Sequence, residues 1–318
     1  MKNRKARLTG ISAALTSAIL LGIVPVFGKQ AILVGFAPLA VVAIRTTIAA
    51  LLLLLIMAIF QRPFFYIYPV GLAGCVLAGF INGLGSILYY TALSRLDASI
   101  GQLLYSFYPL FVALWLLLDR QTLSFLTVLR LGLSIPGVYL LISTSTEKID
   151  LLGALFMLAS AALYALHLII NQRVLFEVPA QTVTLYTLLS MAGTVVVAYL
   201  LFSRQFPPAN APWWPVLGMA AITFFSRLTL FLGIKHLGGL QTALLGLGEV
   251  MITVLVAHWW LEEQLTPAQW GGAILICIAL ILVGFDRYTP TKRHSTGWLA
   301  WLNPPQIPTS DVPWQSQP

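Results

Sequence analysis

Hydrophobic residues run along this chain in about ten long stretches with few polar interruptions. The stretch 39–60, for example, carries a single charge, Arg45, among its 22 residues. An apolar run of ~20 residues matches the ~30 Å hydrocarbon core of a bilayer when it is helical. Backbone groups cannot stay unpaired in lipid, so each stretch is predicted to be a helix rather than an open strand. The ten predicted spans are residues 8–27, 36–60, 69–93, 99–118, 123–142, 151–171, 181–202, 213–234, 240–261 and 268–285.

Composition supports this interpretation. Charged residues make up 9% of the chain and hydrophobic residues 59%, with a mean hydropathy of +0.89, whereas soluble proteins carry roughly 25% charged residues. The connections between spans are short, and the 2 cysteines give neither a disulfide framework nor a metal-binding spacing. We therefore predict an all-α multi-pass membrane protein whose chemistry lies inside the helix bundle. We expect no cofactor and no metal.

The positive charges assign an orientation, because ten spans place both termini on one side. Of the 18 lysines and arginines, eleven fall in segments on the side of the N-terminus, four in the opposite loops and three within spans. Cytoplasmic loops are enriched in such residues, so both termini are predicted to be cytoplasmic, in the plasma (inner) membrane of a bacterium. The net charge of +8 then indicates topology and lipid headgroups rather than nucleic acid.

The chain repeats weakly as two halves of five spans, residues 8–143 and 150–285. The loop at residues 95–98 and the loop at residues 236–239 occupy the same place in each half, 141 positions apart. An odd number of spans per half forces the halves to insert with opposite orientations. Inverted repeats are typical of secondary transporters, with a site near the midplane between the halves. Residues 286–318 are rich in proline and polar residues and are predicted to be a disordered cytoplasmic tail.

The order of several short motifs resembles the EamA group of the drug/metabolite transporter superfamily. In the first half they are Pro38 with Arg45, Tyr90-Thr91-Ala92-Leu93 with Ala98, and Pro109; in the second they are Glu249, Glu263-Gln264-Leu265-Thr266 and Gln269 with Gly272. The resemblance implies ten helices in two five-helix EamA repeats, and transport, usually export, of small solutes.

The sequence departs from the family pattern at two places. Asp119 is followed by Arg120 where the family often has an acidic residue closing the fourth span. Val250 follows Glu249 where a proline is common, so the second half is expected to lack the kink that Pro109 indicates in the first.

Three charged side chains lie deep within predicted spans and need a partner or a water-filled cavity. Glu249, in the middle of span 240–261, is the prime candidate. It is interpreted either as a site carboxylate that binds a cationic group or a proton, or as a structural charge. Arg227 and Arg45 are its expected partners. Each is interpreted either as an anchor for an anionic group or as a structural tie between helices.

Polar and aromatic residues at helical spacing add candidates for a shared cavity. Span six carries Tyr164 and His167 on one face, span three carries Asn82 and Tyr89, and span four carries Tyr108. The alternative interpretation of such residues is hydrogen bonding between helices, which does not require a cavity.

No hydrolase, zinc-protease or nucleotide-binding motif appears in the sequence, so we predict no enzyme. Transport against a gradient would then draw on ions or protons, with Glu249 as the coupling residue. The expected partners are a small solute, the bilayer and protons, and both a monomer and a homodimer remain open. Two other classes stay open as alternatives, an intramembrane lipid-modifying enzyme and a membrane scaffold that does not transport.

Overall fold

The computed structural model describes most of the 318-residue chain. The described residues are 2–119, 125–142, 150–203, 205, 207, 211–260 and 266–282. The predicted tail at 286–318 lies outside them.

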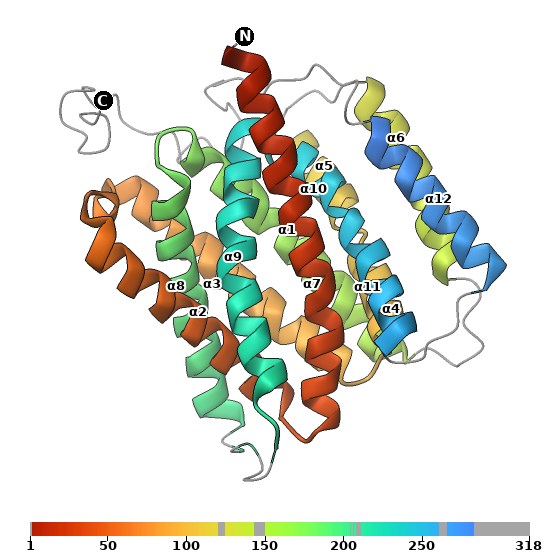
Figure 1. Cartoon of the computed structure of the whole chain (residues 1–318), viewed down its shortest axis with the longest axis horizontal. Coiled ribbons are helices and arrows are strands. Elements are labelled where there is room, and N and C mark those ends of the chain that lie inside the picture. The colour runs from red at the N-terminus through yellow and green to blue at the C-terminus, as the bar shows by residue number, and fades with distance from the viewer. Residues whose placement is uncertain are drawn as a thin grey trace.

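Every regular element in the described part of the chain is a helix (Figure 1). The helices are α1 (Lys2–Leu33), α2 (Pro38–Phe60), the 3₁₀ helix η1 (Arg62–Phe65), α3 (Pro69–Leu93), α4 (Ala98–Tyr105), α5 (Tyr108–Leu118), α6 (Phe125–Ile142), α7 (Leu151–Leu175), α8 (Ala180–Phe202), α9 (Trp214–Leu237), α10 (Gly239–Gly246), α11 (Gly248–Trp260) and α12 (Pro267–Ile281).

Local sequence explains where many of these helices begin. Pro38, Pro69, Pro109 and Pro215 occupy the first turns of α2, α3, α5 and α9. A proline is tolerated there because the first amides of a helix have no intrahelical partner. Between α9 and α10, Gly238 has a φ of 86°, which favours glycine because it has no Cβ.

Seven helical segments in the described residues are long and apolar enough to cross a membrane. They are Ala6–Leu33, Pro38–Phe60, Pro69–Leu93, Leu151–Leu175, Ala180–Phe202, Trp214–Leu237 and Gly239–Trp260. Tyr108–Leu118 is a shorter apolar helix. The protein is therefore an all-helical, multi-pass membrane protein as predicted, but the count of ten spanning helices is not confirmed.

Two of the predicted spans are broken helices. Span 99–118 consists of α4 and α5, and span 240–261 consists of α10 and α11. The second break corrects the expectation that the second half lacks a kink. Although Val250 has an amide hydrogen, it donates to the carbonyl of Leu247 at 3.1 Å rather than continuing the α-helical pattern. The tightened turn at Leu247 thus interrupts the helix without a proline.

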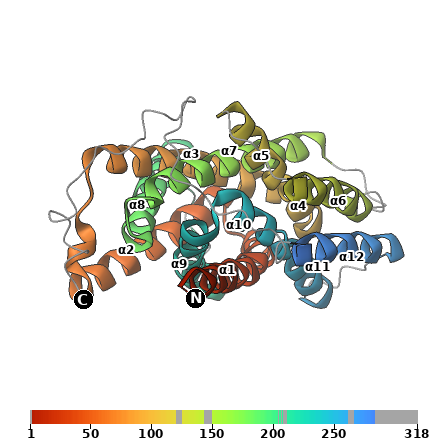
Figure 2. The ribbon, with the colours of Figure 1, turned by 90° about the horizontal axis from the view of Figure 1, so that it is seen from above.

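The long helices form two layers. Viewed from above, α3 and α7 lie in one layer, and α1 and α9 lie in the other (Figure 2). The packing partners are exchanged between the two halves of the chain: α1 packs on α9 and α11, whereas α7 packs on α3 and α5. Helices α6 and α12, the last of each half, pack on each other at one side (Figure 1).

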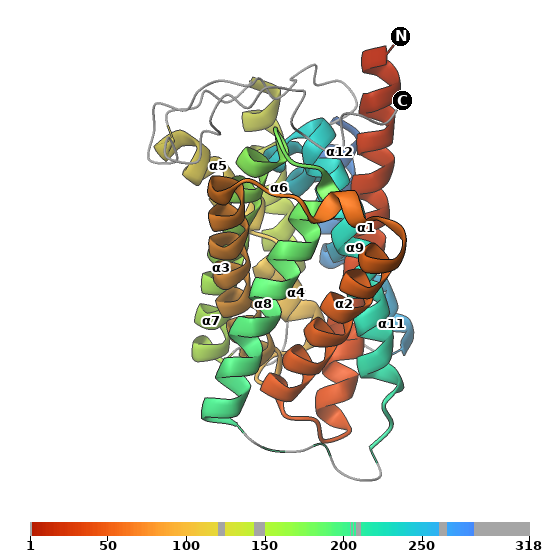
Figure 3. The ribbon, with the colours of Figure 1, turned by 90° about the vertical axis from the view of Figure 1, so that its left-hand side faces the viewer.

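Equivalent connections of the two halves lie at opposite ends of the molecule. Helix α2 ends and α3 begins near the end where the N-terminus lies, whereas α8 ends and α9 begins at the far end (Figure 3). The chain thus enters the second half from the other side of the bundle.

The outer surface of the bundle is apolar. On α2, the side chains of Leu51, Leu55 and Ile59 are more than half exposed, whereas Leu53 and Met57 face inward and are buried. Large exposed apolar patches are rare on soluble monomers. This surface is therefore the one that faces lipid.

Candidate functional site

A polar cavity lies between the two layers and is lined by both halves of the chain. Its volume is about 60 Å³, several times the roughly 10–15 Å³ that one water molecule needs. It is lined by Leu21, Val24, Pro25, Arg45, Asn82, Gly85, Ser86, Tyr89, Tyr90, Gln102, Tyr105, Ser160, Tyr164, Arg227 and Glu249. Six of the eight residues that the sequence singled out therefore share one cavity.

Glu249 reaches the cavity from the first turn of α11 and is only 4% exposed. One carboxylate oxygen, Oε2, accepts a hydrogen bond from Nε2 of Gln102 at 3.4 Å, and Oε1 accepts one from the hydroxyl of Tyr108 at 3.5 Å. The position at a helix N-terminus favours a negative charge, because the helix dipole points its positive end at the side chain. The break at Leu247 thus creates the environment that a buried carboxylate needs.

Tyr108 acts on the cavity through Glu249 rather than by lining it. Its ring is buried at the start of α5, and its single hydroxyl hydrogen is shared between Oε1 of Glu249 and the nearer carbonyl oxygen of Ala243 on α10, which lies at 3.0 Å. A Cβ at Gly246 would lie 1.9 Å from this hydroxyl oxygen. The two broken helices therefore interlock, and glycine at 246 leaves the space that Tyr108 occupies.

Arg45 and Arg227 line the cavity from α2 and α9, and each is 6% exposed. Nη1 of Arg45 donates to the hydroxyl of Thr223 at 2.9 Å, and its guanidinium lies 4.9 Å from the ring centre of Tyr90. Neither arginine forms an ion pair with Glu249, although both were its expected partners. Packing places their guanidiniums on aromatic and neutral polar groups instead.

His167 lies behind the cavity and orients Arg227. Its Nδ1 is 3.0 Å from the carbonyl oxygen of Ala78, so Nδ1 carries the hydrogen and donates. Nε2 then holds a lone pair and accepts from Nη1 of Arg227 at 3.4 Å. The neighbouring ring of Tyr164 is stacked on His167 and lies 5.8 Å from the guanidinium of Arg227. His167 is therefore a positioning residue rather than a lining one.

Tyrosine rings form a continuous wall around one side of the cavity. Tyr105 contacts Tyr89, Tyr108 and Tyr164, with ring centres 5.0 to 5.6 Å apart. The hydroxyl of Tyr89 donates to Oε1 of Gln102 at 3.0 Å, which in turn orients the amide nitrogen of Gln102 toward Glu249. Aromatic side chains here supply both an apolar surface and hydrogen-bond donors.

Asn82 lines the cavity from α3, and its side-chain nitrogen lies 3.1 Å from the sulfur of Met191 on α8. Sequence reasoning missed Gln102, which connects Tyr89 to Glu249, and the contribution of α1. The signals were present, because Gln102 interrupts an apolar span and Pro25 lies inside the first helix. In the described residues no cluster of three or more potential ligands could hold a metal ion.

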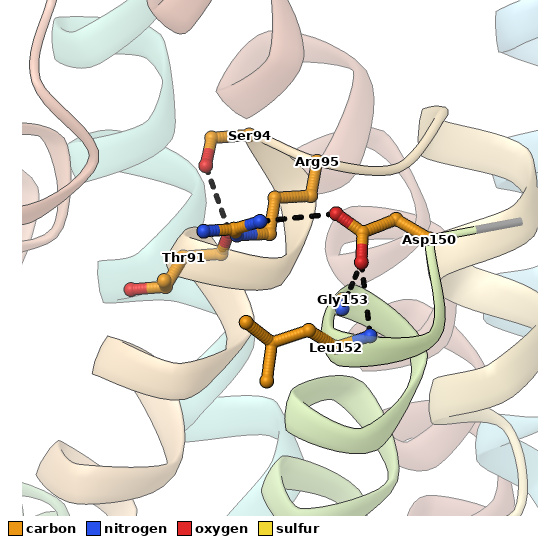
Figure 4. Close-up of polar contacts among 6 residues, drawn as sticks. All are labelled: Thr91, Ser94, Arg95, Asp150, Leu152 and Gly153. Carbon is orange, nitrogen blue, oxygen red and sulfur yellow. Dashed lines mark hydrogen bonds and ion pairs between the residues drawn. The ribbon is translucent and has the colours of Figure 1, made fainter.

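Polar contacts close the bundle on both sides of the cavity. Where α1 and α3 end and α7 begins, Nη1 of Arg95 donates to Oδ2 of Asp150 at 3.0 Å (Figure 4). Nζ of Lys29 donates to the carbonyl of Leu96 at 2.8 Å. We call this end of the molecule the Arg95 end. At the opposite end, Arg173 donates to Asp119 in a buried ion pair.

Asp150 has two roles at the Arg95 end. Its Oδ1 accepts hydrogen bonds from the amides of Leu152 and Gly153, so it is the N-cap of α7 (Figure 4). The hydrogen bond from Arg95, together with these amides, holds the pKa of the Asp150 carboxyl below its ordinary value. The carboxylate form is thus favoured in the folded protein.

A buried charged cavity lined by two similar halves of a helical membrane protein is typical of membrane transport proteins, and comparison with known sequences agrees. The chain belongs to the EamA-like transporter family, whose model matches residues 8–143 and 151–285. The resemblance seen in the sequence is thereby confirmed.

Similar proteins carry transporter names. An uncharacterized transporter of Synechocystis sp. is 28% identical over 236 residues, which cover 70% of this chain and 69% of that protein. An uncharacterized transporter of Archaeoglobus fulgidus is 25% identical over 276 residues, 86% of this chain and 95% of that protein. A protein of known crystal structure shares the fold, with a TM-score of 0.68 at 17% identity, over 89% of this chain and 97% of that one.

Proposed function

We propose that this protein is a secondary transporter that moves a small solute across the membrane by alternating access, in the direction of export. The cavity lined by both halves carries this proposal. Its volume of about 60 Å³ accommodates several waters but is far below the ~300 Å³ of even a small ligand pocket. A solute therefore enters only after the halves move apart.

The proposed topology is ten spans in two inverted repeats, with both termini in the cytoplasm. The exchange of packing partners between α1 and α7, and the opposite ends at which α3 and α9 begin, support the inversion of the two halves. The excess of lysines and arginines on the side of the N-terminus supports the cytoplasmic placement of the termini. In this topology the Arg95 end faces outward. Contacts between the halves at both ends, Arg95 with Asp150 and Arg173 with Asp119, would then break alternately as the site opens to each side.

Thiol labelling tests alternating access directly. Ser86→Cys places a small reporter on the cavity wall, in a chain whose Cys75 and Cys277 are replaced by alanine. A membrane-impermeant thiol reagent is expected to label it from either side of sealed vesicles, and transported solute is expected to slow the labelling. Ala161→Cys, at a fully buried core position, is the matched control and should stay unlabelled.

The alternatives predict different labelling. A scaffold would leave Ser86→Cys unlabelled from both sides, and a lipid-modifying enzyme would admit reagent from one side only. Either result would contradict alternating access.

We further propose that Glu249 couples transport to protons. It is the single carboxylate among the described residues that line the cavity, and its partners Gln102 and Tyr108 are neutral. It can therefore take up and release a proton without breaking an ion pair. Glu249→Gln is expected to keep solute exchange across vesicles while losing transport driven by a pH gradient, and Glu249→Asp to retain part of both. If a pH gradient drives transport by Glu249→Gln as effectively as transport by the parent, the proposed coupling is wrong.

A further inference from the structure

The charges on the cavity do not balance. Arg45 and Arg227 come from different halves of the chain, and Glu249 is the third charged residue among the described lining residues. The carboxylate of Glu249 accepts hydrogen bonds from Gln102 and Tyr108, and no ion pair joins it to either arginine. With all three groups ionised, the cavity carries one positive charge in excess.

The two guanidiniums also have unused donors. A guanidinium has five N–H donors and stays protonated in proteins. Arg45 donates to Thr223 and Arg227 to His167, yet the Nε atoms of both arginines are buried without a hydrogen-bond partner. Buried polar groups in native proteins are normally paired. Both of these atoms belong to arginines that line the cavity, so each guanidinium keeps hydrogen-bonding capacity for a further acceptor.

Both arginines are held in place before any ligand arrives. Tyr90 and Thr223 fix Arg45, while Tyr164 and His167 fix Arg227. A guanidinium fixed in this way suits the planar, two-oxygen geometry of a carboxylate. The remaining wall consists of tyrosine rings and of apolar side chains from α1, which suits an aromatic or aliphatic body.

We propose that the solute carries one carboxylate, which Arg45 and Arg227 bind together inside the cavity, and an apolar body that packs on the tyrosine wall. This inference rests on the proposed transport function and names its substrate class. A monoanion neutralises the excess positive charge, whereas a doubly charged phosphate would leave a net negative site beside Glu249.

Matched probes test the charge requirement. Purified full-length protein is heated with butyrate, phenylacetate or indole-3-acetate, and with the corresponding amides and amines. At least one carboxylate is expected to raise the Tm, whereas its amide and amine, which share the same body, are not. Stabilisation by amides or amines alone, or by none of the carboxylates, would overturn the proposal.

Variants assign the effect to the two arginines. Arg45→Gln and Arg227→Gln are each expected to weaken the apparent affinity for the stabilising carboxylate by about 10- to 100-fold, and Arg45→Lys to weaken it less. Arg62→Gln, at an exposed arginine outside the cavity, is the control and should bind like the parent. The Tm of each variant without ligand reports whether that variant folds. If Arg45→Gln does not fold, Arg45→Lys still tests the role of Arg45. Unchanged affinity in folded arginine variants would also overturn the proposal.

Uptake into vesicles separates this inference from the transport proposal. If the protein transports the amine and does not respond to the carboxylate, the transport proposal stands and the proposed carboxylate site is wrong. Binding of the carboxylate that depends on both arginines, without movement across the bilayer, would preserve the anion site and overturn transport.

Discussion

At the scale of single residues, Glu249 is held by a short chain of neutral hydrogen bonds. Tyr89 orients Gln102, which donates to the carboxylate from α4, and Tyr108 donates to it from α5. Buried polar networks of this kind fix one arrangement only when every member keeps its partner. Close packing is what holds them, and Gly246 is where that packing is tightest against Tyr108.

Gly246→Ala is therefore expected to destabilise the protein. The new Cβ would lie 1.9 Å from the Tyr108 hydroxyl oxygen and 3.3 Å from Oε1 of Glu249, so Tyr108 must move and release Ala243. Overpacking of this kind typically lowers the free energy of unfolding by about 1–3 kcal/mol, which a lower Tm would report. Gly193→Ala, where a Cβ meets nothing within 4 Å, is the matched control and should keep or raise the Tm.

Removing the hydroxyl provides a second check. Tyr108→Phe in the Gly246→Ala background should recover part of the lost Tm, because the closest clash disappears. A Gly246→Ala variant as stable as the parent would show that the interlock between the broken helices is not tight.

At the scale of helices, the site depends on where elements end and cross. The breaks between α4 and α5 and between α10 and α11 bring helix termini into the bundle beside the cavity. α1 crosses α11 so closely that a Cβ at Gly22 would lie 2.7 Å from the carbonyl oxygen of Glu249. At its own start, α7 is fixed by Asp150, which caps the helix and binds Arg95.

The Asp150 cap makes a pH-dependent contribution. Because the folded protein lowers the pKa of this carboxyl, its stabilisation is present at neutral pH and is lost as the pH falls below about 4. Asp150→Asn should therefore have a lower Tm than the parent at pH 7, and the difference should shrink toward zero in acid. The measurement is the Tm of both proteins across pH 3 to 7.

Asp97→Asn provides the matched control. Asp97 precedes α4 but its side chain makes no capping hydrogen bond, so this change removes no cap and should leave the Tm at pH 7 close to that of the parent. A difference between the parent and Asp150→Asn that stays constant with pH would contradict the role of the carboxylate.

At the scale of the whole molecule, α3 of one half and α7 of the other meet at the Arg95 end. Arg95 and Asp150 bridge them, and the Cβ of Arg95 lies 3.1 Å from the position of a Cβ built on Gly153 (Figure 4). Disulfides join residues whose Cβ atoms are about 3.8 Å apart. A small shift would therefore allow a covalent link between the halves.

The double variant Arg95→Cys/Gly153→Cys should transport when reduced and stop when oxidised. The disulfide would hold the Arg95 end closed, so the cavity could open to one side only. Flux in vesicles before and after reductant is the measurement, and each single variant, which cannot form the link, is the control. Full flux in protein shown to be cross-linked would mean that the halves do not separate here.

Much of this architecture could be predicted from the sequence. Hydropathy and span length gave the membrane environment and the helical class, because both depend on local composition. The two halves were predicted because their loops fall at equivalent positions along the chain. The family model matches the chain twice, at residues 8–143 and 151–285. Deep polar residues such as Glu249 and Asn82 stood out because charged and amide groups are costly in lipid.

Other features could not be predicted because they depend on contacts between distant residues. Gln102 reaches Glu249 across 147 positions of the chain, and no local pattern marks the pairing. The break at Leu247 lacks the proline that would have signalled it. The arginines were expected to pair with Glu249, but the fold places their guanidiniums over the rings of Tyr90 and Tyr164.

The sequence by itself thus determined which polar side chains must avoid contact with lipid, because the free-energy cost of transferring a side chain into hydrocarbon depends on its own chemistry. Only the tertiary structure decided which of those residues meet. Packing across both halves sets where the helices break and cross. These breaks and crossings join Glu249 to Gln102 and place Arg45 and Arg227 on the cavity. That packing is a property of the assembled bundle and of no single helix.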